Sequence, residues 1–307
     1  MTPLLSADLL SPCLSQLPVA IGGWLLEPLQ QPFLLRALLL GGLVAVVCAV
    51  LSCYLTLKGW ALMGDGVSHA VLPGVVLAYT LGLPFALGAF VFGLASVGLM
   101  GWIRQQTRIK EDTVIGLVFT GFFAFGLVLI SRLPSGVDLT HILFGNLLGI
   151  TDADAVQTLV ISVAVLLLLL LRGRDLLLFC FDPLHARSIG LRTGRLHYLL
   201  LALLSLTAVA GLQAVGILLV VAMLVTPGAT GYLLSDRFGP MVGVAMVSAL
   251  LATLAGILLS YWLDLSTSGV IVMVQTGQFL LALLLAPRHG LLARRRRGGL
   301  SSAPSLR

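Results

Sequence analysis

Charged side chains are scarce in this sequence, making up 10% of its 307 residues, whereas a soluble domain carries about 25%. So few charges cannot cover a water-facing surface, which excludes a soluble globular protein. Disorder is also excluded, because 59% of the residues are hydrophobic and disordered chains combine low hydrophobicity with high charge. The apolar runs are continuous, unlike the alternating segments of about 10 residues in a transmembrane barrel. These absences predict an all-α, polytopic helical membrane protein.

Several catalytic and targeting motifs are also missing. Neither lysine lies in the Gly-Lys-Ser/Thr of a phosphate-binding loop, and no histidine begins a His-Glu-x-x-His zinc motif. The four cysteines have no Cys-x-x-Cys spacing, so we interpret them as small buried apolar residues. The sequence around Ser68 resembles a hydrolase nucleophile elbow but lacks its final glycine. We therefore expect no enzymatic activity, no permanently bound cofactor and, since no basic region precedes the first apolar stretch, no cleavable signal peptide.

The apolar stretches predict about nine transmembrane helices, with eight as the alternative. A bilayer core of about 30 Å takes ~20 helical residues. The stretch 196–235 must cross twice, with a bend at 211–216, because ~40 helical residues would rise about 60 Å. The expected spans are 37–57, 61–80, 85–103, 113–131, 155–171, two within 196–235, 238–263 and 270–286.

The distribution of lysine and arginine predicts the orientation. With these spans, 16 of the 18 cationic residues fall on one side, and only Arg36 and Arg132 on the other. The positive-inside rule places the C-terminus in the cytoplasm and, with nine spans, the N-terminus outside. The net charge of +6 is therefore juxtamembrane, which argues against a nucleic-acid partner and for contact with membrane lipid. We expect an interfacial segment over 1–32, a transmembrane domain over 33–287 and a basic cytoplasmic tail over 288–307.

Asp65 and His69 form the sharpest chemical constellation. Ionisable groups are costly inside a span and usually face a cavity or a partner. At i and i+4 of a helix, both side chains lie on one face, and a carboxylate with an imidazole suits a borderline divalent cation. The alternative is an N-cap aspartate beside a hydrogen-bonded histidine at the interface, and spacing alone does not decide between the two.

Other polar or helix-weakening residues are candidates for a path or gate. Pro73, followed by Gly74, is expected to weaken the helix just beyond it. His141 lies in an outer loop, where it either receives a metal or anchors an interfacial helix. Thr226 and Pro227 are expected to break the seventh span and free backbone carbonyls, although a packed proline kink is the alternative. Ser68, next to His69, completes this group.

The stretch 181–194 predicts a short amphipathic helix on the inner side, because it starts with Asp-Pro and ends at glycines. Its apolar residues Leu184, Ile189 and Leu191 are suited to a groove on a partner, or to lipid headgroups.

These motifs resemble those of a known family, the membrane permease subunits of the zinc, manganese and chelated-iron ABC importers. The most specific match is Ser-His-Ala-Val-Leu-Pro-Gly at 68–74, and the likeness covers roughly 26–286. One departure is Gly66, where alanine is usual, and it is expected to loosen this helix turn slightly.

The resemblance implies that two permeases pair around one pathway in the plasma membrane of a prokaryote, which is the inner membrane in a Gram-negative cell. Cytoplasmic ATP-binding subunits would dock beneath, and an extracytoplasmic metal-binding protein would deliver the ion. Asp182, Ala186 and Gly190 would belong to the coupling helix, and Asp65 and His69 would face the pathway as transient metal ligands. The expected cargo is manganese, then iron, then zinc. The alternatives are an ion-coupled secondary metal transporter and an ABC permease for a chelated metal or haem.

Overall fold

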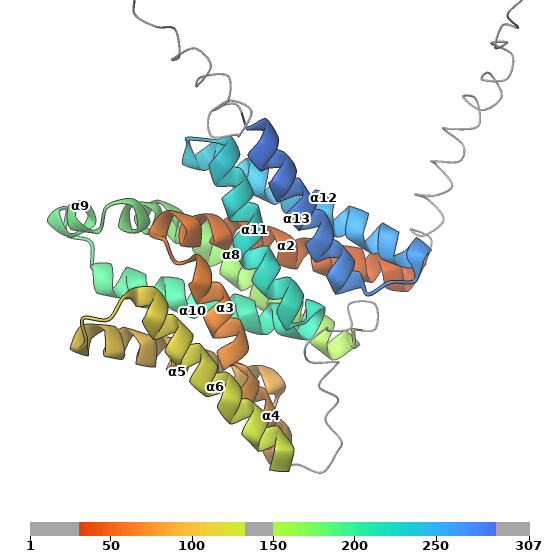
Figure 1. The fold of residues 1–307 in the computed structure, drawn as a ribbon, viewed down its shortest axis with the longest axis horizontal. Helices are drawn as coiled ribbons and strands as arrows, with labels where there is room; N and C mark the ends of the chain where they lie inside the picture. Colours follow the sequence, from red (N-terminus) through yellow and green to blue (C-terminus); the bar gives the residue numbers. More distant parts are fainter. Residues whose placement is uncertain (1–30, 133–149, 287–307) are drawn as a thin grey trace, which may run out of the picture.

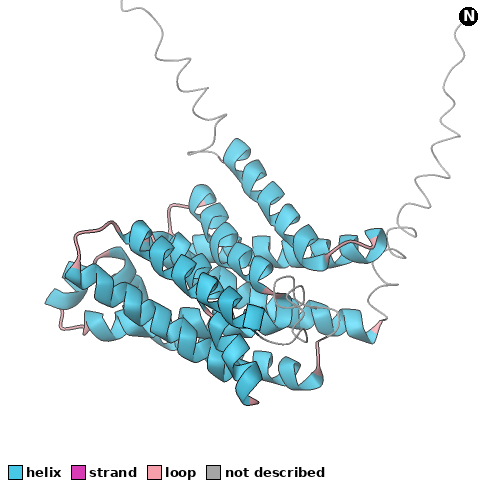
Figure 2. Cartoon of the chain, turned by 60° about the horizontal axis from the view of Figure 1, so that its bottom comes forward, coloured by secondary structure: helices cyan, strands magenta, loops and turns pink. Residues whose placement is uncertain are grey.

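A computed structural model describes residues 31–132 and 150–286 of the chain. These residues form helices joined by short loops, with no strand among them (Figure 2). The all-α prediction is therefore confirmed. Nine helical segments within the described ranges are long and apolar enough to cross a membrane, which confirms the larger of the two expected numbers.

The helices follow one another with few intervening residues. In chain order they are α2 (Pro32–Lys58), α3 (Ala61–Ala70), α4 (Leu72–Leu81), α5 (Phe85–Gln106), α6 (Glu111–Arg132), α8 (Asp152–Phe181), α9 (Pro183–Ser188), α10 (Thr193–Val215), α11 (Ile217–Leu234), α12 (Phe238–Leu263) and α13 (Thr267–Leu285).

Two groups of helices build the molecule. In the first, α2 packs against α8, α11 and α12, and α13 packs against α11 and α12. In the second, α3 to α6 pack on one another, and α10 joins the groups through contacts with α3, α5 and α8. Figure 1 shows the second group at the bottom of the view and α11 to α13 at the top. Buried leucines of α2 and α10, such as Leu51, Leu55, Leu200 and Leu204, form the core that they share.

The predicted bend at 211–216 is confirmed as a sharp turn between two spans. α10 ends at Val215 and α11 begins at Ile217, so Gly216 alone connects them. Its φ of +83° lies in the region that favours glycine. A side chain at Gly211 would overlap Val220, so the second glycine lets the two helices approach each other.

The fifth span is longer than predicted. The expected span ends at Leu171 because Arg172 and Arg174 end the apolar run, but α8 continues to Phe181. Arg172 pairs with Asp175 at 3.4 Å on the same helix, and Leu176, Phe179 and Cys180 beyond this pair are buried against the rest of the chain. At 1.5 Å per residue, the 30 residues of α8 reach about 45 Å, beyond a bilayer core of about 30 Å.

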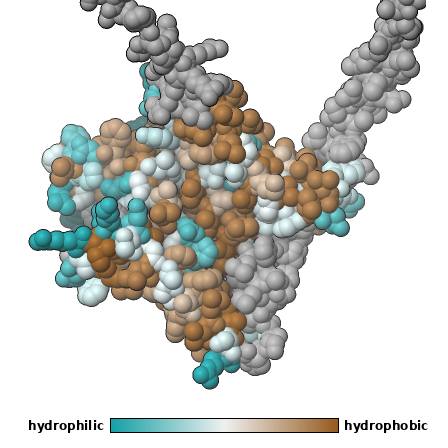
Figure 3. All heavy atoms as spheres, viewed as in Figure 1, coloured by the Kyte–Doolittle hydropathy of each residue, from teal (hydrophilic) through white to brown (hydrophobic). Residues whose placement is uncertain are grey.

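The surface matches a membrane protein. Figure 3 shows hydrophobic side chains over the middle of the molecule and hydrophilic ones gathered at the left of the view, where α9 lies. This hydrophilic end holds Lys58, Arg104 and Arg174 at or near the ends of their helices. We refer to it below as the arginine-rich end.

Candidate functional site

Asp65 and His69 lie on α3, in the most buried of the nine spans that the structure describes. In the most apolar stretch of the span that α3 and α4 form, 72% of the residues are buried, whereas the corresponding fraction is 22% in α6 and in α8. The two side chains nevertheless keep 34% (Asp65) and 23% (His69) of their surface exposed. They therefore lie at the surface of the chain and not in its packed core.

The two side chains contact each other directly. His69 Nδ1 lies 3.0 Å from Asp65 Oδ1 and 3.1 Å from the Asp65 backbone carbonyl oxygen. The i,i+4 spacing on α3 brings them together, as predicted. Because Nδ1 contacts the carboxylate, Nε2 is the ring nitrogen that can bind a metal, and a carboxylate in this position orients the ring.

Two phenylalanines of α6 pack beside the histidine, a contact that the sequence does not predict. The ring of His69 makes edge contacts with Phe119 and Phe123, at centroid distances of 5.2 and 5.5 Å. Their i,i+4 spacing placed them on one helix face, but nothing in the sequence said that this face meets α3. They give the polar pair an apolar wall, which strengthens electrostatic interactions next to it.

Gly66 lets α3 and α6 come close. A Cβ at this position would lie 2.9 Å from Cγ2 of Ile115 on α6. The residue that departs from the family pattern therefore serves helix packing on the side where the phenylalanine wall stands.

A complete metal-binding cluster is not found within the described residues, since no group of three His, Cys, Asp or Glu side chains comes together there. Asp65 and His69 thus offer two ligands from this chain. Cys48, Cys53 and Cys180 are buried, and Cys48 and Cys53 belong to the core around α2.

The other path and gate candidates lie in different surroundings. Ser68 is buried, and its hydroxyl donates to the carbonyl of Gly64 at 2.8 Å on its own helix. Pro73 is buried in the first turn of α4. The interruption falls at Val71, between α3 and α4, so it precedes Pro73 instead of following it. The reason is that proline cannot donate the N–H that would extend α3 but fits a first helical turn. His141 lies outside the described residues.

The expected break at Thr226 and Pro227 is wrong, because α11 runs without interruption from Ile217 to Leu234. Ser52 of α2 supports the backbone around the proline. Its hydroxyl donates to the carbonyl of Val225 at 3.3 Å and accepts the N–H of Gly228 at 3.0 Å. A neighbouring helix thus supplies hydrogen bonds that proline disturbs, which keeps the helix continuous.

The segment 181–194 contains a short capped helix, α9. Its N-cap Asp182 accepts the N–H groups of Leu184 and His185, both at 3.0 Å. At the C-terminal end, Gly190 donates to the carbonyl of Arg187 and Leu191 donates to that of Ala186, with φ of +87° at Gly190. This is a Schellman motif, which ends a helix at a glycine. Thr193 and Gly194 already belong to α10, so the helical part is shorter than predicted.

The two ends of α9 present apolar side chains outward. Leu184 and Ile189 are 79% and 57% exposed, and Phe181, just before the helix, is 79% exposed. Ala186 is fully buried against the rest of the chain. A short rigid helix is therefore anchored on one side and offers apolar residues on the other.

A cavity of about 410 Å³ lies between α3 and α9 at the arginine-rich end. Arg104, Arg187 and His197 line it together with Met63 and Met100. Two guanidinium groups repel a divalent cation, so we do not assign a metal site to this cavity.

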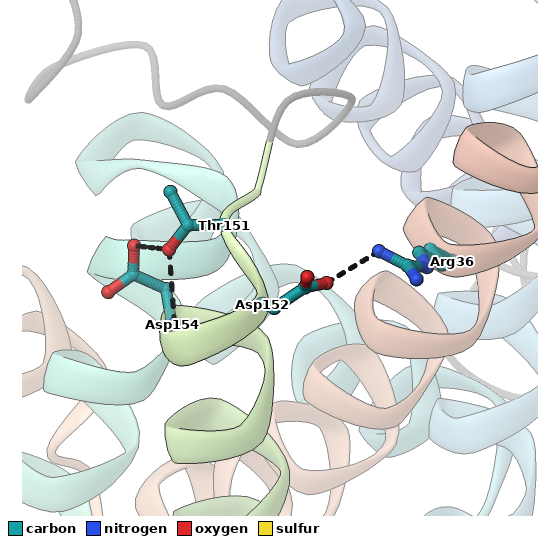
Figure 4. Close-up of polar contacts among 4 residues, drawn as sticks. All are labelled: Arg36, Thr151, Asp152 and Asp154. Atoms are coloured by element: carbon teal, nitrogen blue, oxygen red, sulfur yellow. Dashed lines mark hydrogen bonds and ion pairs between the residues drawn. The ribbon is translucent and has the colours of Figure 1, made fainter.

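At the opposite end of the spans, an ion pair joins α2 to α8. Arg36 Nη1 lies 2.6 Å from Asp152 Oδ1, and both side chains are exposed (Figure 4). Beside it, Thr151 caps α8 by accepting the N–H of Asp154 at 3.2 Å, and its hydroxyl donates to the Asp154 carboxylate. The pair is not predictable from local sequence spacing, because the two residues are far apart in the chain.

The spans, the polar pair inside one of them and the capped helix at one end of them define a polytopic membrane protein. Comparison with known proteins gives the family: the profile of the ABC 3 transport family matches residues 30–286, and the chain belongs to it. "Manganese transport system membrane protein MntB" of Synechocystis sp. is 57% identical over 278 residues, covering 90% of this chain and 91% of the relative. "Chelated iron transport system membrane protein YfeD" of Yersinia pestis is 50% identical, covering 84% of this chain and 87% of its own.

A solved structure agrees with these relatives. PsaBC from Streptococcus pneumoniae in complex with Fab superimposes with a TM-score of 0.81 at 38% identity, covering 90% of this chain and 99% of that one. The chain thus falls in the manganese and iron branch of the ABC permeases, which confirms the family that the motifs suggested.

Proposed function

We propose that this chain is the membrane permease subunit of an ATP-driven importer of divalent transition-metal ions. The observation that carries the proposal is the Asp65–His69 pair, partly exposed inside a transmembrane span. Manganese is the first expected cargo, followed by iron and zinc. The names of the relatives, which concern manganese and iron transport, support this order.

The position of the pair supports a second permease as a partner. Leu62, one turn before Asp65 on α3, is also exposed, but a carboxylate facing lipid inside a span is costly. Covering the face with a second permease removes that cost and encloses a polar path. Two copies would offer two carboxylates and two imidazoles, a donor set that suits Mn²⁺, Fe²⁺ and Zn²⁺.

Energy coupling is assigned to α9. A cytoplasmic ATP-binding subunit would receive the exposed Leu184 and Ile189, with Asp182, Ala186 and Gly190 fixing the shape of the helix. This requires the arginine-rich end to be cytoplasmic, as the positive-inside rule predicts. An extracytoplasmic metal-binding protein would then meet the end that carries Arg36 and Asp152.

A test is growth and radiotracer uptake in a bacterial strain that lacks its own manganese and iron importers. The full transporter should restore both, and a partner ATPase without its phosphate-binding lysine should restore neither. Uptake that persists with the inactive ATPase would favour the ion-coupled secondary transporter. Rescue only by a metal chelate or haem, and not by the bare ion, would favour an ABC permease for a chelated metal or haem.

A further inference from the structure

A groove of about 820 Å³ lies at the arginine-rich end, on the side of α8 away from the cavity described above. Three spans, α2, α8 and α11, end around it, and α12 begins there. It is therefore at the boundary between the spans and water. Phe181, just before α9, lines it, but no residue assigned to the path and none of Asp182, Ala186 and Gly190 does.

The groove has cationic and apolar walls. Arg174 and Arg237 both line it and are exposed, and Asp236 is the acidic residue among the lining side chains. The exposed Tyr232 adds a hydroxyl, while Phe181 and Phe238 supply aromatic surface. Two guanidinium groups beside apolar walls match a ligand with an anionic head and a hydrocarbon body.

Contacts beneath the groove hold its walls in place. The hydroxyl of Tyr54 on α2 donates to the carbonyl of Gly173 on α8 at 3.4 Å. The ring of Tyr54 also packs on Phe238 of α12, with centroids 5.0 Å apart. One residue of α2 thus ties together the helices that carry Arg174 and Phe238.

We propose that this groove binds the headgroup of an anionic phospholipid from the inner leaflet. The geometry points to a lipid because the charged groups lie at the level where the spans end and the apolar walls continue from them. Basic pockets between transmembrane helices on the cytoplasmic side bind acidic headgroups in this way. Arg174 and Arg237 would hold the phosphate, and Phe238, at the start of α12, would contact the first acyl carbons.

The experiment is native mass spectrometry of the transporter purified with its ATPase, titrated with phosphatidylglycerol or phosphatidylcholine. Each arginine near an anionic headgroup contributes about a fivefold gain in affinity. The double variant Arg174→Gln/Arg237→Gln should therefore bind phosphatidylglycerol about 30-fold more weakly, with phosphatidylcholine adducts unchanged. The matched control is Arg192→Gln/Arg195→Gln, which removes the same charge from the same end outside the groove and should bind as the wild type does.

Several results would overturn the proposal. One is equal phosphatidylglycerol binding by the two double variants, and another is phosphatidylcholine binding as tightly as phosphatidylglycerol. Loss of the ATPase from the groove variant, with lipid binding intact, would show that the groove contacts protein. If the double variant does not fold, Arg237→Gln alone should weaken binding about fivefold, and an unchanged affinity would count against the groove. None of these results bears on metal uptake, so failure here leaves the proposed function standing.

Discussion

Asp65 and His69 owe their chemistry to being neighbours on one helix face. The 3.0 Å contact fixes Nδ1 of the imidazole on the carboxylate, and Phe119 and Phe123 restrict the ring from the other side. A ligand held in this way does not have to be ordered when the ion arrives. Ser68, although adjacent in sequence, is buried and bonded to its own helix, so neighbouring residues of one motif have different roles.

Replacing the ionisable pair should stop transport without unfolding the chain. Asp65→Asn keeps the shape but weakens the hold on His69 and on the ion, and loss of such a carboxylate partner costs about 10–100-fold in metal affinity. We expect radiotracer uptake to fall by a similar factor for Asp65→Asn and further for His69→Ala, with unchanged expression. Ser68→Ala is the control, and it should transport normally. Wild-type uptake by both pair variants would refute the ligand role.

Gln275 on α13 is a residue whose replacement should stabilise the protein. Its side chain is 1% exposed, and neither amide atom has a hydrogen-bond partner within the described part of the chain. An unsatisfied buried amide costs about 1–3 kcal/mol, so Gln275→Leu should raise the free energy of unfolding by that amount. Gln278→Leu on the same helix should lower it, because Gln278 accepts the hydroxyl of Ser248 at 2.7 Å. Thermal unfolding in detergent measures both, and a lower melting temperature for Gln275→Leu would show that the amide has a partner in the membrane.

At the scale of helices, the apolar runs were enough to predict the spans, because each exceeds the length a bilayer needs and ends at a charge, glycine or proline. The same rule failed at the end of α8, where Arg172 and Asp175 pair with each other on a helix that continues to Phe181. The prediction of a break at Pro227 also failed, because Ser52 of α2 supplies hydrogen bonds to the backbone of α11 on both sides of the proline. In the site, the i,i+4 pair was predictable from local spacing, whereas its aromatic wall depends on which helices meet. That tertiary information is not contained in any local pattern.

The crossing of α4 and α5 depends on two glycines in contact. A Cβ at Gly74 would overlap the backbone carbonyl of Gly88, and the reverse also holds, so neither helix can give way locally. Gly74→Ala should destabilise the protein by about 1–3 kcal/mol, as overpacking does. Gly98→Ala on α5 has open space around it and should be neutral or slightly stabilising. Melting temperatures in detergent compare the two, and equal values would show that the helices separate easily.

Substitution of Gly190 tests whether α9 binds in a groove of the ATP-binding subunit. Its φ of +87° strains any other residue, but no atom of the described chain lies within 4 Å of a Cβ there. Gly190→Arg should therefore fold almost as well as Gly190→Ala, which carries the same backbone strain. We expect the arginine variant alone to lose metal-stimulated ATPase activity and uptake, because its long side chain meets the ATP-binding subunit. Normal transport by Gly190→Arg would show that α9 rests on lipid.

For the whole molecule, the distribution of ligand types decides which metals can pass. The thiols of the described residues, which would favour soft ions, are buried: Cys48 and Cys53 are fully inaccessible. Within the described spans, Asp65 and His69 supply a partly exposed carboxylate and imidazole, a set that accepts Mn²⁺, Fe²⁺ and Zn²⁺ with little preference. A site of so few ligands also releases its ion readily, as transport requires. Selection would then be made by the delivering protein, before the ion reaches the membrane.

Selection of the metal by the delivering protein predicts the outcome of competition between metals. In cells carrying the complete transporter, manganese should be taken up first, with iron next and zinc third. The order should follow the extracytoplasmic binding protein, so exchanging that protein for one that prefers zinc should allow zinc to pass through the same permease at a comparable rate. A Cys48→Ser/Cys53→Ser variant should keep the order unchanged, because those thiols are buried. Radiotracer uptake from mixtures of the three metals measures the order. Zinc uptake in preference to manganese with the native binding protein would overturn the ranking. Failure of the exchanged protein to change the order would show that the permease itself selects the metal.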